Sequence, residues 1–119
     1  METLAILAVL EAKPGKERDV EAFLRSALSI ARSEPGTINW YALKLGTSRF
    51  GIFDTFADSS GRDAHLAGEL AVALFATAQD LFVAPPVIDH STIIAVKSCE
   101  ARVGERGISP QAARASRGS

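Results

Sequence analysis

The chain has 119 residues and a formal net charge of −1, with 47% hydrophobic and 23% charged residues. This size and composition fit one globular domain that can bury a core. The near-neutral charge argues against a nucleic acid or an anionic membrane as a partner selected by bulk electrostatics. Two histidines, one methionine and the single cysteine Cys99 are too few for a structural zinc site, an iron–sulfur cluster or an intrachain disulfide. We therefore expect a small cytoplasmic protein.

Residues 4–10 form a continuous apolar run near the N-terminus. A signal peptide would have a basic segment before such a run, but Glu2 precedes it and the first basic residue is Lys13. The run is also far shorter than the roughly 20 residues that span a bilayer. We interpret it as part of a buried first strand over residues 3–12, with neither export nor anchoring.

An amphipathic helix is predicted next, between the turns Lys13-Pro14-Gly15 and Pro35-Gly36. Its apolar residues recur at helical spacing: Val20, Phe23, Leu24, Ala27, Leu28 and Ala31.

Two strands, 37–45 and 49–57, then form a predicted hairpin around Gly46-Thr47-Ser48. A three-residue turn would place Trp40 opposite Asp54, and a two-residue turn would place Tyr41 there. The sequence does not choose between these registers.

A further helical region follows, with Ser59 or Ser60 as the N-cap and Asp63 completing a variant capping box. Gly68 marks a point at which this region divides into two helices, and residues 87–97 are predicted as a fourth strand. The order β-α-β-β-α-β predicts an α+β, ferredoxin-like fold with a four-stranded antiparallel sheet. We expect this domain over residues 1–98 and a flexible basic tail over 99–119.

Both faces of the predicted sheet are apolar. The first strand has Leu4, Ile6, Ala8 and Leu10 on one face and Ala5, Leu7 and Val9 on the other. Two helices cover only one face, and the uncovered apolar face is larger than soluble monomers tolerate. At ~25 cal/mol per Å², hiding about 800 Å² stabilises by on the order of 20 kcal/mol before association costs. These considerations predict a homodimer that packs sheet against sheet.

Several short motifs occur in a characteristic order within residues 3–97. They are a Lys-Pro-Gly-Lys turn, Glu34-Pro35-Gly36, the Phe-rich segment 49–56 and Ala64-His65-Leu66. In this order the chain resembles the antibiotic biosynthesis monooxygenase family of dimeric α+β barrel proteins. The resemblance implies a homodimer with one small-molecule pocket per subunit between sheet and helices. Some members of that family oxidise polycyclic phenols with O₂ and without metal or flavin, and others degrade haem, act on quinols or signalling molecules, or have no demonstrated reaction. A haem-degrading branch of this family is similar in fold and has an Asn/Trp/His constellation whose Asn lies in the first strand. Residues 3–12 of this chain contain no Asn.

An oxygenase without a cofactor needs a base, hydrogen-bond donors and aromatic walls around a phenol that it deprotonates. His65 is the leading candidate for the base, and Glu69, one turn further on, could orient it. The alternative is that His65 only packs, or pairs with Glu69 at the surface.

Asn39, Trp40 and Tyr41 form the densest polar and aromatic cluster in the chain. Asn39 is a candidate donor to an oxyanion, while Trp40, Tyr41 and Phe53 are candidates for binding a planar substrate. Packing in the core or at a dimer interface is an equally good interpretation of these aromatic residues.

Asp54 interrupts an apolar strand face, which predicts a buried carboxylate that is paired or has a raised pKa. It is a candidate second proton acceptor, or an anchor for backbone amides or Arg62. Asp89 and His90 are adjacent in a strand and point to opposite faces, so we expect no cooperation between them. Cys99 has no neighbouring histidine, and we expect no redox role for it.

The leading hypothesis is a cofactor-free monooxygenase that acts on a small aromatic or quinol-type molecule. A dimer that binds a ligand or is purely structural, without catalysis, is the second hypothesis. A small-carbonyl isomerase or decyclase that uses His65 or Asp54 as a proton shuttle is the third.

Overall fold

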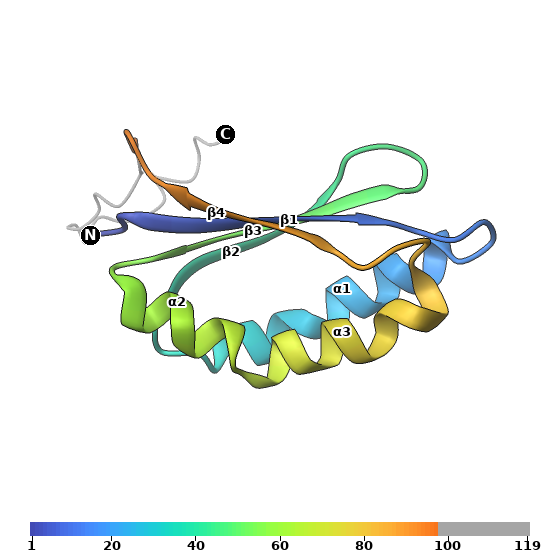
Figure 1. The fold of residues 1–119 in the computed structure, drawn as a ribbon, viewed down its shortest axis with the longest axis horizontal. Helices are drawn as coiled ribbons and strands as arrows, with labels where there is room; N and C mark the ends of the chain where they lie inside the picture. Colours follow the sequence, from blue (N-terminus) through green and yellow to red (C-terminus); the bar gives the residue numbers. More distant parts are fainter. Residues whose placement is uncertain (98–119) are drawn as a thin grey trace, which may run out of the picture.

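The computed structural model describes residues 1–97, in which four strands form one antiparallel sheet in the order β2-β3-β1-β4. The elements are β1 Leu4–Glu11, α1 Glu17–Arg32, β2 Thr37–Lys44, β3 Arg49–Phe56, α2 Ser59–Leu66, α3 Glu69–Leu81 and β4 Val87–Thr92. All three helices lie on one face of the sheet (Figure 1). This architecture confirms the predicted ferredoxin-like α+β fold. The predicted tail and Cys99 lie outside the described residues.

The core lies between the sheet and the helices, and the strand alternation explains which residues enter it. Leu10 of β1 and its cross-strand partner Phe50 of β3 are each 1% exposed. Val20 and Leu24 of α1 and Leu74 of α3 pack against this pair in one apolar cluster. The apolar residues that recur at helical spacing in the helices and at alternate positions in the strands therefore pack into one core.

The opposite face of the sheet has no helix over it (Figure 1). Leu7, Val9 and Phe53 are half-buried on this face, while Tyr41 is 51% exposed and Val87 is 59% exposed. The sequence prediction that both faces are apolar therefore agrees with the placement of these side chains. Among residues 1–97, none of the helices combines the length and apolar character needed to cross a membrane.

The hairpin between β2 and β3 adopts the register of the three-residue turn. The Leu45 backbone amide donates to the Arg49 carbonyl at 2.8 Å, and Trp40 pairs with Asp54 across the strands. Because cross-strand partners share a face, Trp40 and Asp54 both point towards the helices. Tyr41 pairs with Phe53, and both point to the uncovered face.

Two of the predicted boundaries are wrong. The fourth strand ends at Thr92 instead of residue 97, because its partner β1 begins at Leu4, which pairs with Thr92. Beyond that pair only the Ile93 amide still bonds to the Thr3 carbonyl, at 2.8 Å. The N-cap of α2 is Asp58 instead of a serine; its Oδ1 accepts from the amides of Ser60 and Gly61.

The turn before β2 touches α2 through two glycines. A Cβ built on Gly61 would lie 2.8 Å from the Gly36 carbonyl oxygen, and one on Gly36 would lie 2.9 Å from the Gly61 Cα. Gly68, as predicted, separates two helices and is the N-cap of α3. The glycine contact allows the backbone that carries Glu34 to approach the helix that carries His65.

We predict that Gly61→Ala destabilises the protein by about 1–3 kcal/mol, although alanine is the better helix former, because the added methyl meets the Gly36 backbone. Gly46→Ala is the matched control, since a Cβ there meets nothing closer than 3.9 Å. Urea denaturation of both variants measures the difference. Equal stability of the two variants would contradict the close packing of the turn on α2.

Candidate functional site

Three titratable side chains from separate parts of the chain meet beneath the sheet. His65, in the last turn of α2, lies between Glu34 of the turn before β2 and Asp54 of β3. Its Nδ1 is 2.7 Å from Glu34 Oε1, and its Nε2 is 3.0 Å from Asp54 Oδ2. Thr37 Oγ1 donates a further hydrogen bond to Glu34 Oε1 at 2.7 Å. We call Glu34, Asp54 and His65 the buried ion cluster.

The two carboxylates determine the protonation state of His65. Burial alone would lower the pKa of the imidazole, but the neighbouring Asp54 and Glu34 carboxylates outweigh it and raise the pKa to about 9. His65 is therefore an imidazolium at neutral pH. A histidine in this state does not suit the role of a base; it is a cation held between two carboxyl groups.

Polar atoms without partners remain beside this cluster. Asp54 is 1% exposed, and its Oδ1 has no hydrogen-bond partner among the described residues. The indole Nε1 of Trp40, on the strand position facing Asp54, is likewise buried without a partner there. A free acceptor and a free donor thus occupy neighbouring positions on one sheet face, and buried polar groups in this state mark a place where a ligand or water can bind.

A cleft of about 380 Å³ opens between α1 and β2, on the helix-covered side of the sheet. We call it the helix-side cleft. Apolar side chains of both layers line it, namely Leu24, Leu28, Trp40 and Phe50. Its charged lining residues are exposed: Glu21, Arg25 and Lys44. The hydrogen bond from Arg25, followed by the charges of Arg25 and Lys44, holds the pKa of Glu21 below its usual value. Trp40 belongs to the cleft wall and also faces Asp54 across the strands.

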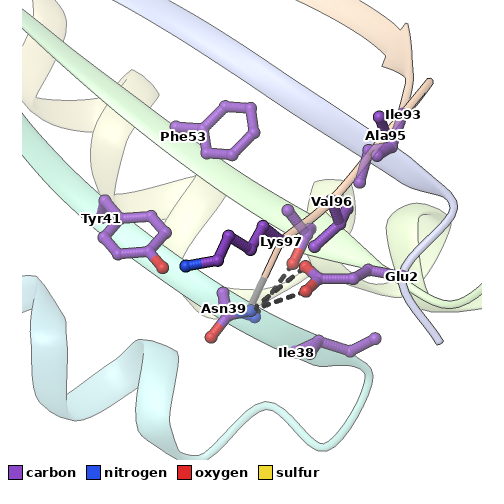
Figure 2. A pocket seen from close by; sticks show the side chains of 10 residues that line it. Glu2, Ile38, Asn39, Tyr41, Phe53, Ile93, Ala95, Val96 and Lys97 are labelled. Atoms are coloured by element: carbon purple, nitrogen blue, oxygen red, sulfur yellow. Dashed lines mark hydrogen bonds between the residues drawn. The ribbon is translucent and has the colours of Figure 1, made fainter. Parts of the chain in front are cut away.

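The other predicted site residues lie on the uncovered face, in a hollow of about 770 Å³. Figure 2 shows Tyr41 and Phe53 on one side of this hollow and Ile93, Ala95 and Val96 on the other. The Tyr41 and Phe53 rings stack with centroids 6.3 Å apart. Asn39 Nδ2 donates to both Glu2 carboxylate oxygens, at 3.1 and 3.2 Å. The sheet therefore separates Asn39, Tyr41 and Phe53 from His65, Asp54 and Trp40.

Several partner assignments differ from the sequence prediction. Glu34, which sequence reasoning used only as part of a turn, contacts His65 in place of the exposed Glu69. Asp54 is met by His65 instead of Arg62. His65 lies in the last turn of α2, because the helix ends at Leu66. Within residues 1–97, no group of three or more His, Cys, Asp or Glu side chains is arranged to hold a metal ion.

Comparison with solved structures places the chain among known folds. It is 50% identical to the protein NE2512 of unknown function from Nitrosomonas europaea, over 82% of this chain and 95% of that one, with a TM-score of 0.80. The chain belongs to the same family as NE2512. No model of a protein family matches the chain, and a search of curated proteins finds no match either.

Two more distant matches define the fold. A Nitrosomonas europaea structure named "Putative antibiotic biosynthesis monooxygenase" is 15% identical, over 77% of this chain and 90% of that one, with a TM-score of 0.69. A structure with the same designation from Caulobacter crescentus is 16% identical, over 79% and 92%, with a TM-score of 0.68. These matches confirm the resemblance to the antibiotic biosynthesis monooxygenases, whose fold this chain has.

The charge state of His65 makes a testable contribution to stability. Its folded pKa of about 9 exceeds the ordinary 6.5, so this contribution, about 3 kcal/mol, is complete below pH 6.5 and is lost as pH rises towards 9. We expect ring-nitrogen NMR to show a titration near 9 that moves down in Asp54→Asn. The free energy of unfolding should fall between pH 6.5 and about pH 9 in the wild type. The control variant His90→Gln should show the same decrease. A His65 that titrates near 6.5 would contradict the ion cluster.

Proposed function

We propose that the protein is a cytoplasmic homodimer that binds a small aromatic or quinol-type molecule in the helix-side cleft and oxidises it with O₂ without a cofactor. One observation carries this proposal: the unpartnered donor Trp40 Nε1 and the unpartnered acceptor Asp54 Oδ1 occupy facing positions on neighbouring strands. A phenol hydroxyl has the matching pair of functions, because it accepts from the indole and donates to the carboxylate.

Asp54 does not line the cleft, so in this proposal the phenol hydroxyl reaches it past the Trp40 ring. Asp54 then takes the phenol proton and Trp40 stabilises the resulting phenolate. His65 acts as a positioning residue, because its Nε2 lies 3.0 Å from Asp54 Oδ2 and leaves Oδ1 free to take the phenol proton. The phenolate then reduces O₂, so that one oxygen atom becomes the new quinone oxygen and the other leaves as water. The named neighbours with this fold support oxygenase chemistry at the level of fold.

The dimer would bury the uncovered face of the sheet. Its half-buried Leu7, Val9 and Phe53 and its exposed Tyr41 form an apolar surface that no helix covers. Burying such a surface against a second copy removes it from water, and in this arrangement Tyr41 and Phe53 act as interface residues.

A second candidate function is binding without catalysis. It is favoured by the fact that neither Asp54 nor His65 lines the helix-side cleft, so that Trp40 stands between the cleft and the buried ion cluster. A pure binder would gain thermal stability with its ligand and consume no oxygen.

The oxygenase hypothesis predicts O₂ consumption with some members of a panel of hydroxylated naphthalenes and anthracenes, and none under anaerobic conditions. Asp54→Asn should lower kcat about 100-fold, because the amide cannot accept the proton. Glu69→Gln is the matched control, since Glu69 is exposed on α3 and should keep full activity. His65→Gln should shift the pH profile as well as the rate. If ligands stabilise the protein but no O₂ is consumed, the oxygenase hypothesis is wrong and the hypothesis of binding without catalysis is supported.

The dimer hypothesis predicts that sedimentation at micromolar concentration finds a particle with twice the mass of one chain. Phe53→Asp should yield a monomer, because it places a charge in the middle of the apolar sheet face. Val72→Asp is the control, because Val72 is 65% exposed on α3. This helix lies on the other face of the sheet (Figure 1), so the variant should remain dimeric. A monomeric wild type would contradict the proposal.

A further inference from the structure

Positive charge is in excess at the exposed end of the helix-side cleft. Arg25 and Lys44 contribute two cations there, and Glu21 contributes the only anion among the lining residues. Arg25 Nη2 lies 2.7 Å from Glu21 Oε2, while Lys44 Nζ lies 3.8 Å from Glu21 Oε1. One carboxylate therefore serves two cations, and it holds the arginine much more closely than the lysine.

These contacts are easily exchanged for others. The side chains of Arg25, Lys44 and Glu21 are 77%, 58% and 40% exposed. Ion pairs with this exposure contribute little to stability, so an incoming anion loses little by replacing Glu21. Lys44 Nζ also lies 5.9 Å from the centre of the Phe50 ring, a contact that keeps the ammonium over the apolar lining.

The two ends of the cleft differ in chemistry. The inner wall includes the Trp40 ring, whose indole N–H is buried without a partner and can donate a hydrogen bond but not accept one. Trp40 and Lys44 are four residues apart on the same face of β2, which separates their backbones by about 13 Å. A rigid ligand of two fused rings with polar groups at its two ends has a comparable length once a hydrogen bond at each end is added.

We propose that the helix-side cleft selects planar, two-ring aromatic acids, with a carboxylate held by Lys44 and Arg25 and a hydroxyl oxygen that accepts a hydrogen bond from Trp40 Nε1. This inference rests on the proposed function for the location of the ligand, and it adds the acidic group and the residues that recognise it. Glu21 is then a competitor that a bound carboxylate displaces from Lys44.

The test compares 6-hydroxy-2-naphthoate with its neutral isostere, 6-hydroxy-2-naphthamide, on the full chain. Trp40 is the only tryptophan, so the single indole N–H resonance in an NMR titration reports directly on the cleft. We expect both probes to move this resonance and the acid to bind about three- to fivefold more tightly, the upper range for an ion pair with side chains this exposed. Omitting the hydroxyl, as in 2-naphthoate, should reduce the shift of the indole proton.

Charge variants identify the residues responsible. Lys44→Met should remove the preference for the acid while leaving the affinity for the amide within about twofold, and Glu21→Gln should tighten binding of the acid. Lys16→Met is the matched control, because it removes the same charge outside the cleft lining. An equal effect of Lys16→Met would overturn the inference in favour of a general charge effect.

The remaining outcomes separate the inference from the proposed function. If the acid and the amide bind equally and both move the Trp40 resonance, the acid preference is wrong and the cleft remains the ligand site. If neither probe moves the Trp40 resonance, and the hydroxylated panel also fails to do so, both proposals fall together.

Discussion

The contact between the His65 imidazolium and the Glu34 and Asp54 carboxylates is the constraint on which this structure depends. Charges removed from water are costly unless they are paired, and each member of this cluster comes from a different element. The pairing therefore fixes the turn before β2, strand β3 and helix α2 relative to one another. The close approach of Gly36 and Gly61 is the backbone counterpart of the same arrangement, because it brings Glu34 within reach of His65.

The hairpin register decides which residues share a site. Side chains alternate along a strand, so a slip of one residue would exchange the two faces of β2. In the observed register Trp40 faces Asp54, whereas Asn39 and Tyr41 face the side without helices. Six residues predicted as one site are therefore divided between the two faces of the sheet: Trp40, Asp54 and His65 lie on the helix-covered side, and Asn39, Tyr41 and Phe53 on the other.

The element order could be predicted from sequence because it depends on local periodicity. The spacing of Val20, Leu24 and Ala27 identified α1, and all three residues are buried. The end of β4 could not be predicted in this way, because β-branched residues continue to residue 96 and the strand stops where its partner β1 begins. Glu34 was missed for a related reason. It meets His65 across 31 positions of sequence, and its Glu-Pro-Gly context is typical of a turn whatever the carboxylate does.

The charge of His65 also changes the chemistry that the residue types alone had indicated. A histidine near a carboxylate is often interpreted as a base, but a second carboxylate on its other nitrogen leaves it protonated at neutral pH. Two carboxyl groups face the one imidazolium and contact both of its ring nitrogens, so the cluster leaves no cationic atom free to attract an anion. An acidic ligand would consequently turn its carboxylate away from Asp54 and towards the Arg25 and Lys44 end of the cleft. Under the proposals above the cleft therefore has a direction, with the ligand's hydroxyl inward and its negative charge outward.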